Sequence, residues 1–428
     1  MKKHAAFLFL GFLVISFPAE AAETLTLQKA YELALKRSED IAIHSELIEE
    51  AEGHFYQAFS GILPKFHYVL TRFEQEAAQS VSSDSGATSN LLRSKTPQQK
   101  FTVTQPLFSG FKEFAGMRGT AAEKAQRKYE KKRAEELLFI DVAEAYYGLQ
   151  AVRSDLNTYD HVGAVLSDRV RELNDRAKIG RSRESESSTA TVDLKFAQAD
   201  REDAARAEGV WRRLLEFYIG TKIKGELVDE DETLDAVPAS EILAHTDQRS
   251  DVLAAKEAAT FADKKAAAAW GELFPSVKLD GNYYTERVGT QADIDWDVLL
   301  TIDVPLFEGT TAVGDIKSAS AVKESAKLAW FRARRVAARE AEDAFETFQS
   351  SVRRQNLLYE AKAASEENSR MQTEEYRLSL VSNLDVLQAL RFHEEAALRW
   401  NRARYETKIN FWKMKIAAGK TVVSGVEP

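Results

Sequence analysis

Apolar and polar residues alternate in four short segments of this chain, and a period of two with one apolar face is typical of a half-buried β-strand. The clearest alternation runs from 293 to 304, where apolar residues are separated mainly by aspartates. Strands of about ten residues match a tilted crossing of an outer membrane. The sequence therefore predicts strands over about 64–75, 98–107, 275–287 and 293–306.

Two long stretches have the composition of helices. None of the eight prolines lies between 107 and 237 or between 306 and 427, and proline interrupts helices. Both stretches are rich in alanine, glutamate, arginine, lysine, leucine and glutamine, which are strong helix formers. We expect long helices over 107–178 and 307–377, each antiparallel to two shorter ones. One seam has the four-three spacing of a coiled coil: Val322, Ala326, Ala329, Ala333 and Val336.

The chain also contains an internal repeat. The segment Gln-Pro-Leu-Phe-Ser-Gly at 105–110 matches Val-Pro-Leu-Phe-Glu-Gly at 304–309, and 178–186 aligns with 377–385 at the same offset of 199 residues. Residues 37–41 resemble 249–252. Each half then consists of helix, strand, strand and helix. The expected organisation is a first repeat at 22–220, a mid-height linker at 221–238, a second repeat at 239–418 and a tail at 419–428.

The first 21 residues have the pattern of a secretory signal peptide. Lys2 and Lys3 precede an apolar run of 13 residues, Ala5–Phe17, and a small-residue cleavage site follows at 19–21. The run is too short to cross a membrane comfortably. No later stretch approaches 18 consecutive apolar residues, so we expect an exported chain that can enter a membrane only as strands.

Composition removes several classes of function. The absence of cysteine excludes disulfides, thiol catalysis and cysteine-zinc sites, and a formal charge of -9 argues against nucleic acid as a partner. Phosphate-loop, dinucleotide, nucleophile-elbow and zinc-protease motifs are absent, and the seven histidines have no ligand spacing. We expect no enzyme activity, no metal and no cofactor.

Four strands cannot close a barrel, and an open strand edge cannot face lipid. Two copies would give eight strands, whose interior is filled by side chains, whereas three copies give twelve and begin to leave a lumen. A hollow conduit therefore requires at least a trimer. Polar strand faces carrying Asp280, Asp295, Asp297 and Asp303 suit a wet interior.

The alternative is a periplasmic structural coiled-coil protein whose strands pack in water without a membrane barrel. The signal peptide favours the membrane, as do aromatic residues near the strand ends, which match an interfacial girdle. The Ser-rich segment Ala77–Thr96, between the first two strands, then becomes a long loop outside the cell. The aromatic residues are Phe55, Tyr56, Phe59, Phe108, Phe111, Phe114, Phe274 and Phe307.

The whole exported chain resembles the TolC-type outer-membrane factors. The signal peptide, the duplicated halves, the paired PLF-x-G junctions and the segment 376–387, similar to the family's helix-tip turn, carry the resemblance. It implies a mainly α fold with a small β part, in which a homotrimer shares a periplasmic α-barrel of long coiled helices and a twelve-stranded transmembrane β-barrel. The junctions between barrel and helices contain Pro64, Pro106, Pro275 and Pro305.

The resemblance also implies a function. Such a channel-tunnel spans outer-membrane lipid, extends far into the periplasm, and is the exit duct of a tripartite efflux or type I secretion system. Its partners are a periplasmic adaptor protein and an inner-membrane pump or transporter ATPase.

The resemblance places a periplasmic gate at the helix tips. Asp385 matches an acidic ring position, Tyr376 a restraining tyrosine and Glu186 its carboxylate partner. Val381 stands where the best-known member has the arginine of its closing salt link, and Arg183, like its neighbour Arg181, lies near the first tip and could substitute. Gln388 replaces a second acidic residue found in some members.

Turn chemistry alone gives an alternative explanation of the same residues. Ser382 or Asn383 can cap the last helix, with Asp385 favourable in its first turn. Gly180 suits a left-handed turn, whereas Ser379 at the matching position does not need that conformation so plainly.

Overall fold

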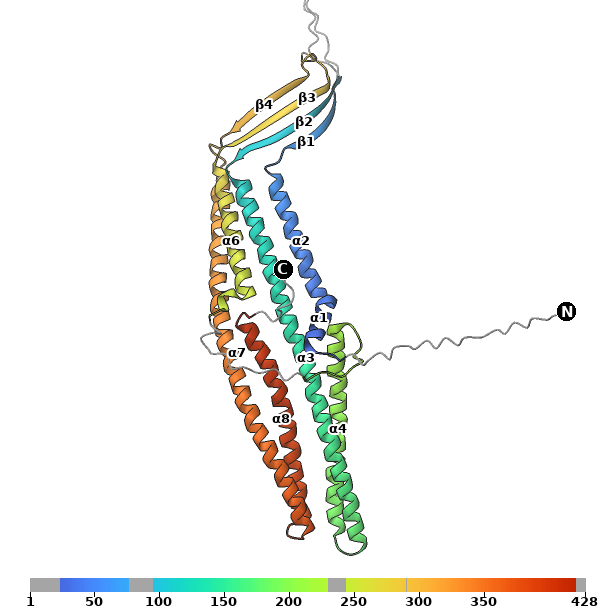
Figure 1. The fold of residues 1–428 in the computed structure, drawn as a ribbon. Helices are drawn as coiled ribbons and strands as arrows, with labels where there is room; N and C mark the ends of the chain where they lie inside the picture. Colours follow the sequence, from blue (N-terminus) through green and yellow to red (C-terminus); the bar gives the residue numbers. More distant parts are fainter. Residues whose placement is uncertain (1–23, 77–94, 230–243, 290, 421–428) are drawn as a thin grey trace, which may run out of the picture. The chain divides into compact units, whose positions relative to one another are not determined.

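The computed structural model describes residues 24–76, 95–229, 244–289 and 291–420. The expected signal peptide, most of the Ala77–Thr96 loop, the second half of the linker and most of the tail lie outside these residues. The elements, in order, are α1 Leu27–Arg37, α2 Glu39–Ser60, β1 Lys65–Glu74, β2 Lys95–Ser109, α3 Lys112–Lys178, α4 Glu184–Ile219, the 3-10 turn η1 Thr246–Gln248, α6 Ser250–Trp270, the 3-10 turn η2 Gly271–Leu273, β3 Ser276–Arg287, β4 Trp296–Asp303, α7 Thr311–Arg377 and α8 Asn383–Ala417 (Figure 1).

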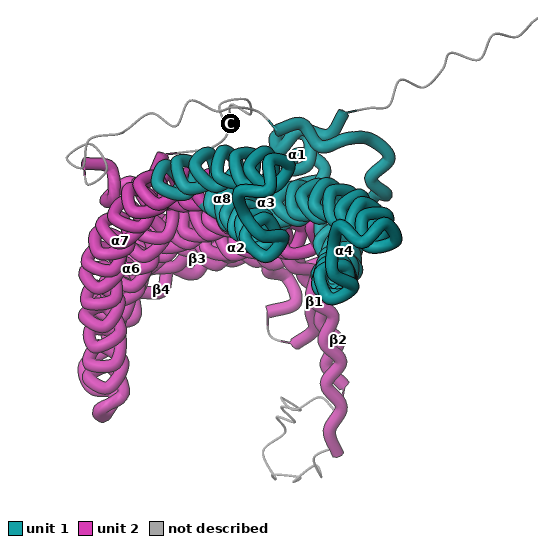
Figure 2. The backbone as a smooth tube through the Cα atoms, turned by 90° about the horizontal axis from the view of Figure 1, so that it is seen from below, with its two compact units in different colours: residues 1–37, 141–234, 355–406 teal, residues 38–140, 235–354, 407–428 magenta. Residues whose placement is uncertain are grey.

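The chain divides into two compact units that do not follow the two repeats (Figure 2). Unit 1 consists of residues 1–37, 141–234 and 355–406, and unit 2 consists of 38–140, 235–354 and 407–428. The boundaries between the units fall inside α3, which belongs to the first half of the chain, and inside α7 and α8, which belong to the second half. Each unit therefore contains segments from both halves.

The helices α3 and α7 are 67 residues long each, which at 1.5 Å per residue is about 100 Å. Both begin a few residues later than expected, because Gly110 and Gly309 adopt a positive φ, 66° and 71°, just before them. In the described part of the chain, no helix combines the length and the apolar character needed to cross a membrane.

The short helix at the start of the first repeat is interrupted. One helix was expected there, but α1 ends at Arg37 and α2 begins at Glu39. Ser38 interrupts the helix because its backbone is extended, with ψ of 116°, and its Oγ accepts a hydrogen bond from the N–H of Ile41 at 3.4 Å. This is the geometry of a helix N-cap, which ends one helix and starts the next.

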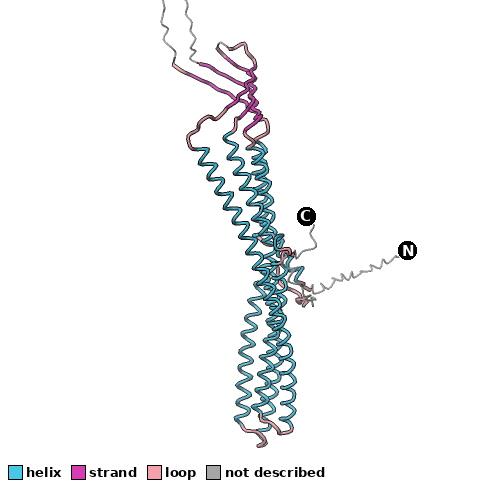
Figure 3. The backbone as a smooth tube through the Cα atoms, turned by 90° about the vertical axis from the view of Figure 1, so that its left-hand side faces the viewer, coloured by secondary structure: helices cyan, strands magenta, loops and turns pink. Residues whose placement is uncertain are grey.

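The four strands, drawn in magenta in Figure 3, form one antiparallel sheet. Their order in the sheet is β1-β2-β3-β4 (Figure 1). The pairing of β2 with β3 joins the two halves of the chain. β2 begins three residues before its expected start, because Lys95 and Thr96 pair with Glu74 and Phe73 of β1 and are not part of the loop.

Candidate functional site

Two helix-to-helix turns in unit 1 share one hydrogen-bond pattern. In the α3–α4 turn the N–H groups of Gly180 and Arg181 donate to carbonyls three and five residues earlier, at 3.0 and 2.8 Å. In the α7–α8 turn Ser379 and Leu380 do the same, at 2.9 Å each. This pattern is the Schellman motif, which satisfies the last carbonyls of a helix. The sequence repeat at an offset of 199 residues is therefore a structural repeat of two turns.

Ser379 corrects one expectation. Its φ is 61°, close to the 71° of Gly180, so both residues adopt the left-handed conformation that the Schellman motif requires. A side chain in this region costs roughly 1–2 kcal/mol because its Cβ crowds the backbone. Serine is therefore strained at a position where its counterpart is glycine.

Substitution of Ser379 by glycine is expected to raise the free energy of unfolding by about 1 kcal/mol, because glycine adopts this φ without Cβ strain. The reverse change, Gly180→Ser, should lower it by a similar amount, since a Cβ at 180 would meet nothing within 4 Å and only the backbone conformation is penalised. Thermal denaturation followed by circular dichroism measures both. Identical melting of the two variants would contradict this account.

Asp385 lies in the first turn of α8 and its side chain is exposed. Its Oδ2 accepts hydrogen bonds from the Oγ–H and the backbone N–H of Ser382, at 2.7 and 2.9 Å. The hydroxyl bond, followed by the backbone bond, lowers the pKa of Asp385 below its usual value. A carboxylate that bonds back to the N-cap residue is one half of a capping box. Within one chain Asp385 therefore stabilises the start of α8, and its carboxyl group remains ionised at neutral pH.

Glu186 occupies the equivalent position in α4. Its Oε2 accepts a hydrogen bond from the hydroxyl of Ser182 at 2.7 Å. Arg183 is the residue preceding α4, with an extended backbone, and it makes no side-chain cap hydrogen bond. Its carbonyl oxygen accepts a hydrogen bond from the N–H of Glu186 at 3.0 Å, and its side chain is exposed at the helix tip.

Tyr376 is buried at the end of α7, where its ring lies against two guanidinium groups of α3. The Cζ atoms of Arg169 and Arg176 lie 3.7 and 5.1 Å from the ring centroid, a cation–π geometry. The Nε of Arg169 also donates to Asn383 Oδ1 at 2.9 Å, and Asn383 Nδ2 reaches the backbone oxygen of Glu186 at 3.5 Å. The two turns are therefore linked through Arg169 and Asn383.

Sequence reasoning missed Arg169, because it sits in a charged helical stretch that resembles any solvated helix face. It also paired Tyr376 with Glu186, whereas within this chain Tyr376 contacts arginines and Glu186 contacts Ser182. Val381 packs against the apolar cluster between the four helix ends, which explains an apolar residue at this position. The cluster consists of Val162, Leu166, Leu173, Ala190, Ala197, Tyr376, Val386, Leu387 and Leu390.

The junction prolines lie at strand ends, with one exception. Pro64 and Pro275 directly precede β1 and β3, and Pro305 follows the end of β4. Pro106 lies inside β2, beside a register irregularity with β3 between Pro106 and Phe108. Proline has no N–H to donate to a neighbouring strand, so an irregularity is expected there.

In unit 2, one face of the sheet is polar. Hydrogen bonds cross it from strand to strand: Thr102 donates to Asn282 at 2.8 Å, and Asn282 donates to Asp297 at 2.8 Å. Two residues further along, on the same face, Thr104 donates to Asp280 at 2.7 Å. These polar side chains occupy the positions that the alternating pattern assigned to a wet face.

The opposite face of the sheet is apolar and exposed. Residues that lie directly opposite each other on neighbouring strands point to the same face of the sheet. On this face, one line of paired residues runs across all four strands and contains an aromatic residue from each. The four aromatic side chains expose between 51% and 66% of their surface. This row comprises Tyr68, Phe101, Tyr283 and Trp296.

Known proteins share this fold without close sequence similarity. No family model matches the chain, and no curated protein sequence matches it. Among solved structures, CusC is 16% identical with a TM-score of 0.79, covering 92% of both chains. VceC of Vibrio cholerae is 19% identical, with a TM-score of 0.78 over 92% of this chain and 96% of VceC. CmeC of Campylobacter jejuni is 18% identical, with a TM-score of 0.78 over 92% of this chain and 86% of CmeC.

VceC is an outer membrane protein, CmeC is an outer membrane channel, and the structures of CusC concern transmembrane channel formation. At such low sequence identity, the structural similarity establishes the fold alone. This chain therefore has the fold of these outer-membrane channels, as its resemblance to the TolC-type outer-membrane factors predicted.

Proposed function

We propose that this protein is an outer-membrane channel-tunnel, the exit duct of a tripartite efflux or type I secretion system. The observation that carries the proposal is the exposed aromatic row on one face of the sheet, opposite a hydrogen-bonded polar face. A lipid-facing apolar surface with aromatic residues and a polar inner surface is the pattern of a transmembrane β-barrel. The fold shared with outer-membrane channels supports the same role.

The edges of the sheet support a homotrimer. Among the described residues of a single chain, β1 and β4 each pair with one neighbouring strand, so each has an open edge there. In lipid these backbone groups must be hydrogen-bonded, which requires pairing with other copies. Three copies give a barrel of twelve strands with a lumen, whereas two give a filled barrel. The long helices then form the periplasmic part of the duct.

The helix turns support a periplasmic partner. Their leucine and isoleucine side chains expose between 63% and 71% of their surface. Exposed apolar residues gathered at one place are typical of protein–protein interaction sites. We infer that a periplasmic adaptor protein docks here and connects the duct to an inner-membrane pump or transporter ATPase. These side chains are Ile179, Leu378, Leu380 and Leu384.

Reconstitution tests the function. The protein, extracted from outer membranes in detergent, is expected to appear as a trimer in native mass spectrometry and to produce conductance steps in a planar lipid bilayer. A water-soluble protein recovered from the periplasm, without conductance, would instead support the structural coiled-coil alternative.

A substitution at Asp385 tests whether the helix tips form a gate. If three copies bring Asp385 close together, their like charges repel one another and attract a cation, so divalent cations on the periplasmic side should block the current. Asp385→Ala is expected to weaken this block several-fold without changing the trimer yield. Glu395→Ala is the control, since Glu395 is exposed on the same helix and pairs with Arg399. Block equal to that of the wild type would leave Asp385 with a capping role only.

A further inference from the structure

Each edge strand of the sheet carries an apolar residue among the polar residues of one face. On β1 this residue is Val69, and on β4 it is Leu299, whose side chain is 57% exposed. Side chains alternate between the faces of a strand, so both lie on the face of Thr102 and Asn282. Their neighbours on that face are Lys65, His67 and Thr71 on β1, and Asp297, Thr301 and Asp303 on β4.

The ends of the two edge strands carry groups of complementary chemistry. β1 begins at Lys65 and β4 ends at Asp303, and both side chains are exposed. Neither of these charges forms an ion pair or a side-chain hydrogen bond with another described residue. Further along the sheet, an exposed Arg72 lies on β1, and an exposed Trp296 begins β4.

These complementary groups occur at the same intervals on the two antiparallel edges. Val69 comes four residues after Lys65 and three before Arg72. In the opposite chain direction, Leu299 comes four residues before Asp303 and three after Trp296. One register therefore brings a cation to a carboxylate, an aliphatic side chain to another, and a guanidinium to an indole.

We propose that β1 of one copy pairs with β4 of the next in this register, with Val69 directly opposite Leu299. The inference rests on the proposed trimeric duct and specifies how its copies join. All eight residues of β4 are then paired, with residues 65–72 of β1. Opposite charges, aliphatic contacts and a cation over an aromatic ring each stabilise directly paired residues.

Other registers lose these contacts. A slip of one residue would place the apolar face of one strand beside the polar face of the other, so the competing registers differ by two residues. Shifted one way, Val69 lies opposite Thr301, and Lys65 extends past the end of β4. Shifted the other way, Val69 lies opposite Asp297. Neither shifted register keeps any of the three complementary contacts.

Barrel closure favours the same register. Directly paired residues run from Lys65 through Thr104 and Asp280 to Leu299. With Leu299 opposite Val69, this line returns to β1 four residues further along the strand. At a rise of about 3.4 Å and a strand spacing of about 4.7 Å, the strands tilt by about 36°, within the range of about 35–45° for membrane barrels. The shifted registers give tilts of about 20° and about 47°.

Disulfide cross-linking tests the register, because the chain contains no cysteine of its own. Three double variants share Val69→Cys and add Leu299→Cys, Thr301→Cys or Asp297→Cys. Directly opposite residues have Cα atoms about 4.5–5.5 Å apart, which a disulfide can bridge, whereas those displaced by two residues are about 7–8 Å apart. Within one copy, β1 and β4 are three strand spacings apart, about 14 Å, so a disulfide can form only between copies.

After oxidation in outer membranes, we expect the Val69→Cys, Leu299→Cys variant to give at least about tenfold more covalent trimer than either other variant. Native mass spectrometry under reducing conditions checks that all three assemble equally.

Charge reversal gives a second readout. Lys65→Asp should lower the temperature at which the trimer dissociates in detergent, because it places two aspartates opposite each other. Adding Asp303→Lys should restore most of this loss. A folding defect unrelated to pairing would not be rescued in this way, and a failure of rescue would contradict the pairing of Lys65 with Asp303.

The outcomes separate this inference from the proposed function. Preferential cross-linking of Val69→Cys with Thr301→Cys or Asp297→Cys would overturn the register. An absence of cross-links from all three variants of a conducting trimer would show that these two edges do not pair, although the duct would stand. A monomeric protein without conductance would overturn both.

Discussion

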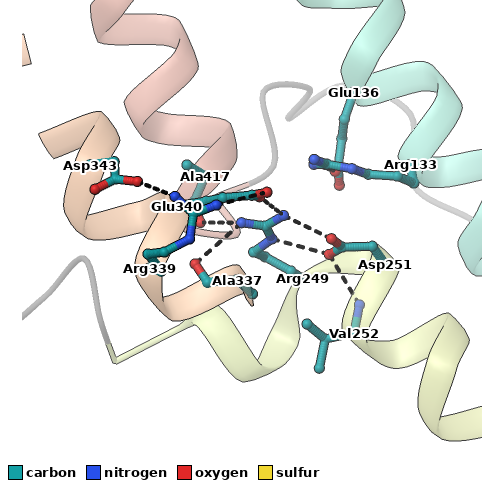
Figure 4. Close-up of polar contacts among 10 residues, drawn as sticks. All are labelled: Arg133, Glu136, Arg249, Asp251, Val252, Ala337, Arg339, Glu340, Asp343 and Ala417. Carbon is teal, nitrogen blue, oxygen red and sulfur yellow. Dashed lines mark hydrogen bonds and ion pairs between the residues drawn. The ribbon is translucent and has the colours of Figure 1, made fainter. Parts of the chain in front are cut away.

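Replacement of Arg249 by methionine is expected to lower the free energy of unfolding by roughly 3 kcal/mol, the scale for removing one partner of a buried ion pair. Arg249 directly precedes α6 and is only 1% exposed, which makes it one of the most deeply buried large side chains of unit 2. Its Nη2 lies 2.7 Å from an oxygen of Asp251 and 2.9 Å from an oxygen of Glu340 of α7 (Figure 4).

The same guanidinium also reaches backbone oxygens. Its Nη1 lies 3.4 Å from the carbonyl oxygen of Ala337 in α7 and 3.5 Å from that of Ala417, the last residue of α8. The final carbonyls of a helix have no partner within the helix, so Arg249 serves as a C-terminal cap for α8. One side chain thus joins the start of α6, the middle of α7 and the end of α8. Methionine fills part of the volume but donates none of these hydrogen bonds.

An exposed arginine of α7 provides the matched control for Arg249. Arg334 pairs with Asp247 at 2.6 and 2.8 Å, but both side chains are largely exposed. Surface pairs contribute about 0–1 kcal/mol, so Arg334→Met should change stability little. Chemical denaturation of both variants, followed by circular dichroism, gives the comparison. If the two variants lost equal stability, burial would not be what makes Arg249 important.

Gly110→Ala is expected to be the most damaging change at the junction between sheet and helices. Gly110 lies between β2 and α3 with φ of 66°, and a Cβ there would overlap the carbonyl oxygen of Gly271. Conversely, a Cβ at Gly271 would lie 2.7 Å from the carbonyl oxygen of Gly110. The two glycines thus allow backbones of the first and second repeats to approach closely. We expect a loss of about 1 kcal/mol from the left-handed conformation and about 1–3 kcal/mol more from overpacking.

The internal repeat provides the control for this prediction. Gly309 is the residue equivalent to Gly110 in the second half, with φ of 71°, but a Cβ there would meet nothing within 4 Å. Gly309→Ala should therefore cost only the backbone strain, about 1 kcal/mol. Thermal melting of the two variants in the same detergent measures the difference. Equal losses would show that the contact with Gly271 is relieved by a small backbone shift.

Local patterns in the sequence determined the elements of this fold. Proline-free stretches rich in helix formers predicted α3, α4, α7 and α8, because helix propensity and the absence of proline act within a few residues. Alternation predicted the four strands and assigned Asp280 and Asp297 to the polar face, because side chains of a strand point alternately to its two faces. The repeat at 199 residues aligned the two helix-to-helix turns with each other.

The sequence could not determine features that depend on partners distant along the chain. Arg249 lies in a segment that resembles 37–41, and that resemblance carries no sign that its charge is buried between α6, α7 and α8. The left-handed Ser379 was missed because the Schellman hydrogen bonds, rather than the residue type, impose its φ. Tyr376 was recognised as a tip residue, but its contact with Arg169 depends on how α3 and α7 pack.

The burial of Asp193 illustrates the same limit. In the sequence it is one acidic residue of a charged helix, and such residues usually belong to a solvated surface. Only the tertiary structure places α4 against α8, so that one oxygen of Asp193 is paired with Arg391 and the other is buried without a partner among the described residues. Burial and pairing are properties of packing between segments about 200 residues apart, whereas helix and strand formation follow from neighbours. For this protein the sequence by itself therefore determined the elements and their repeat, and the tertiary structure decided which charges are buried and what they contact.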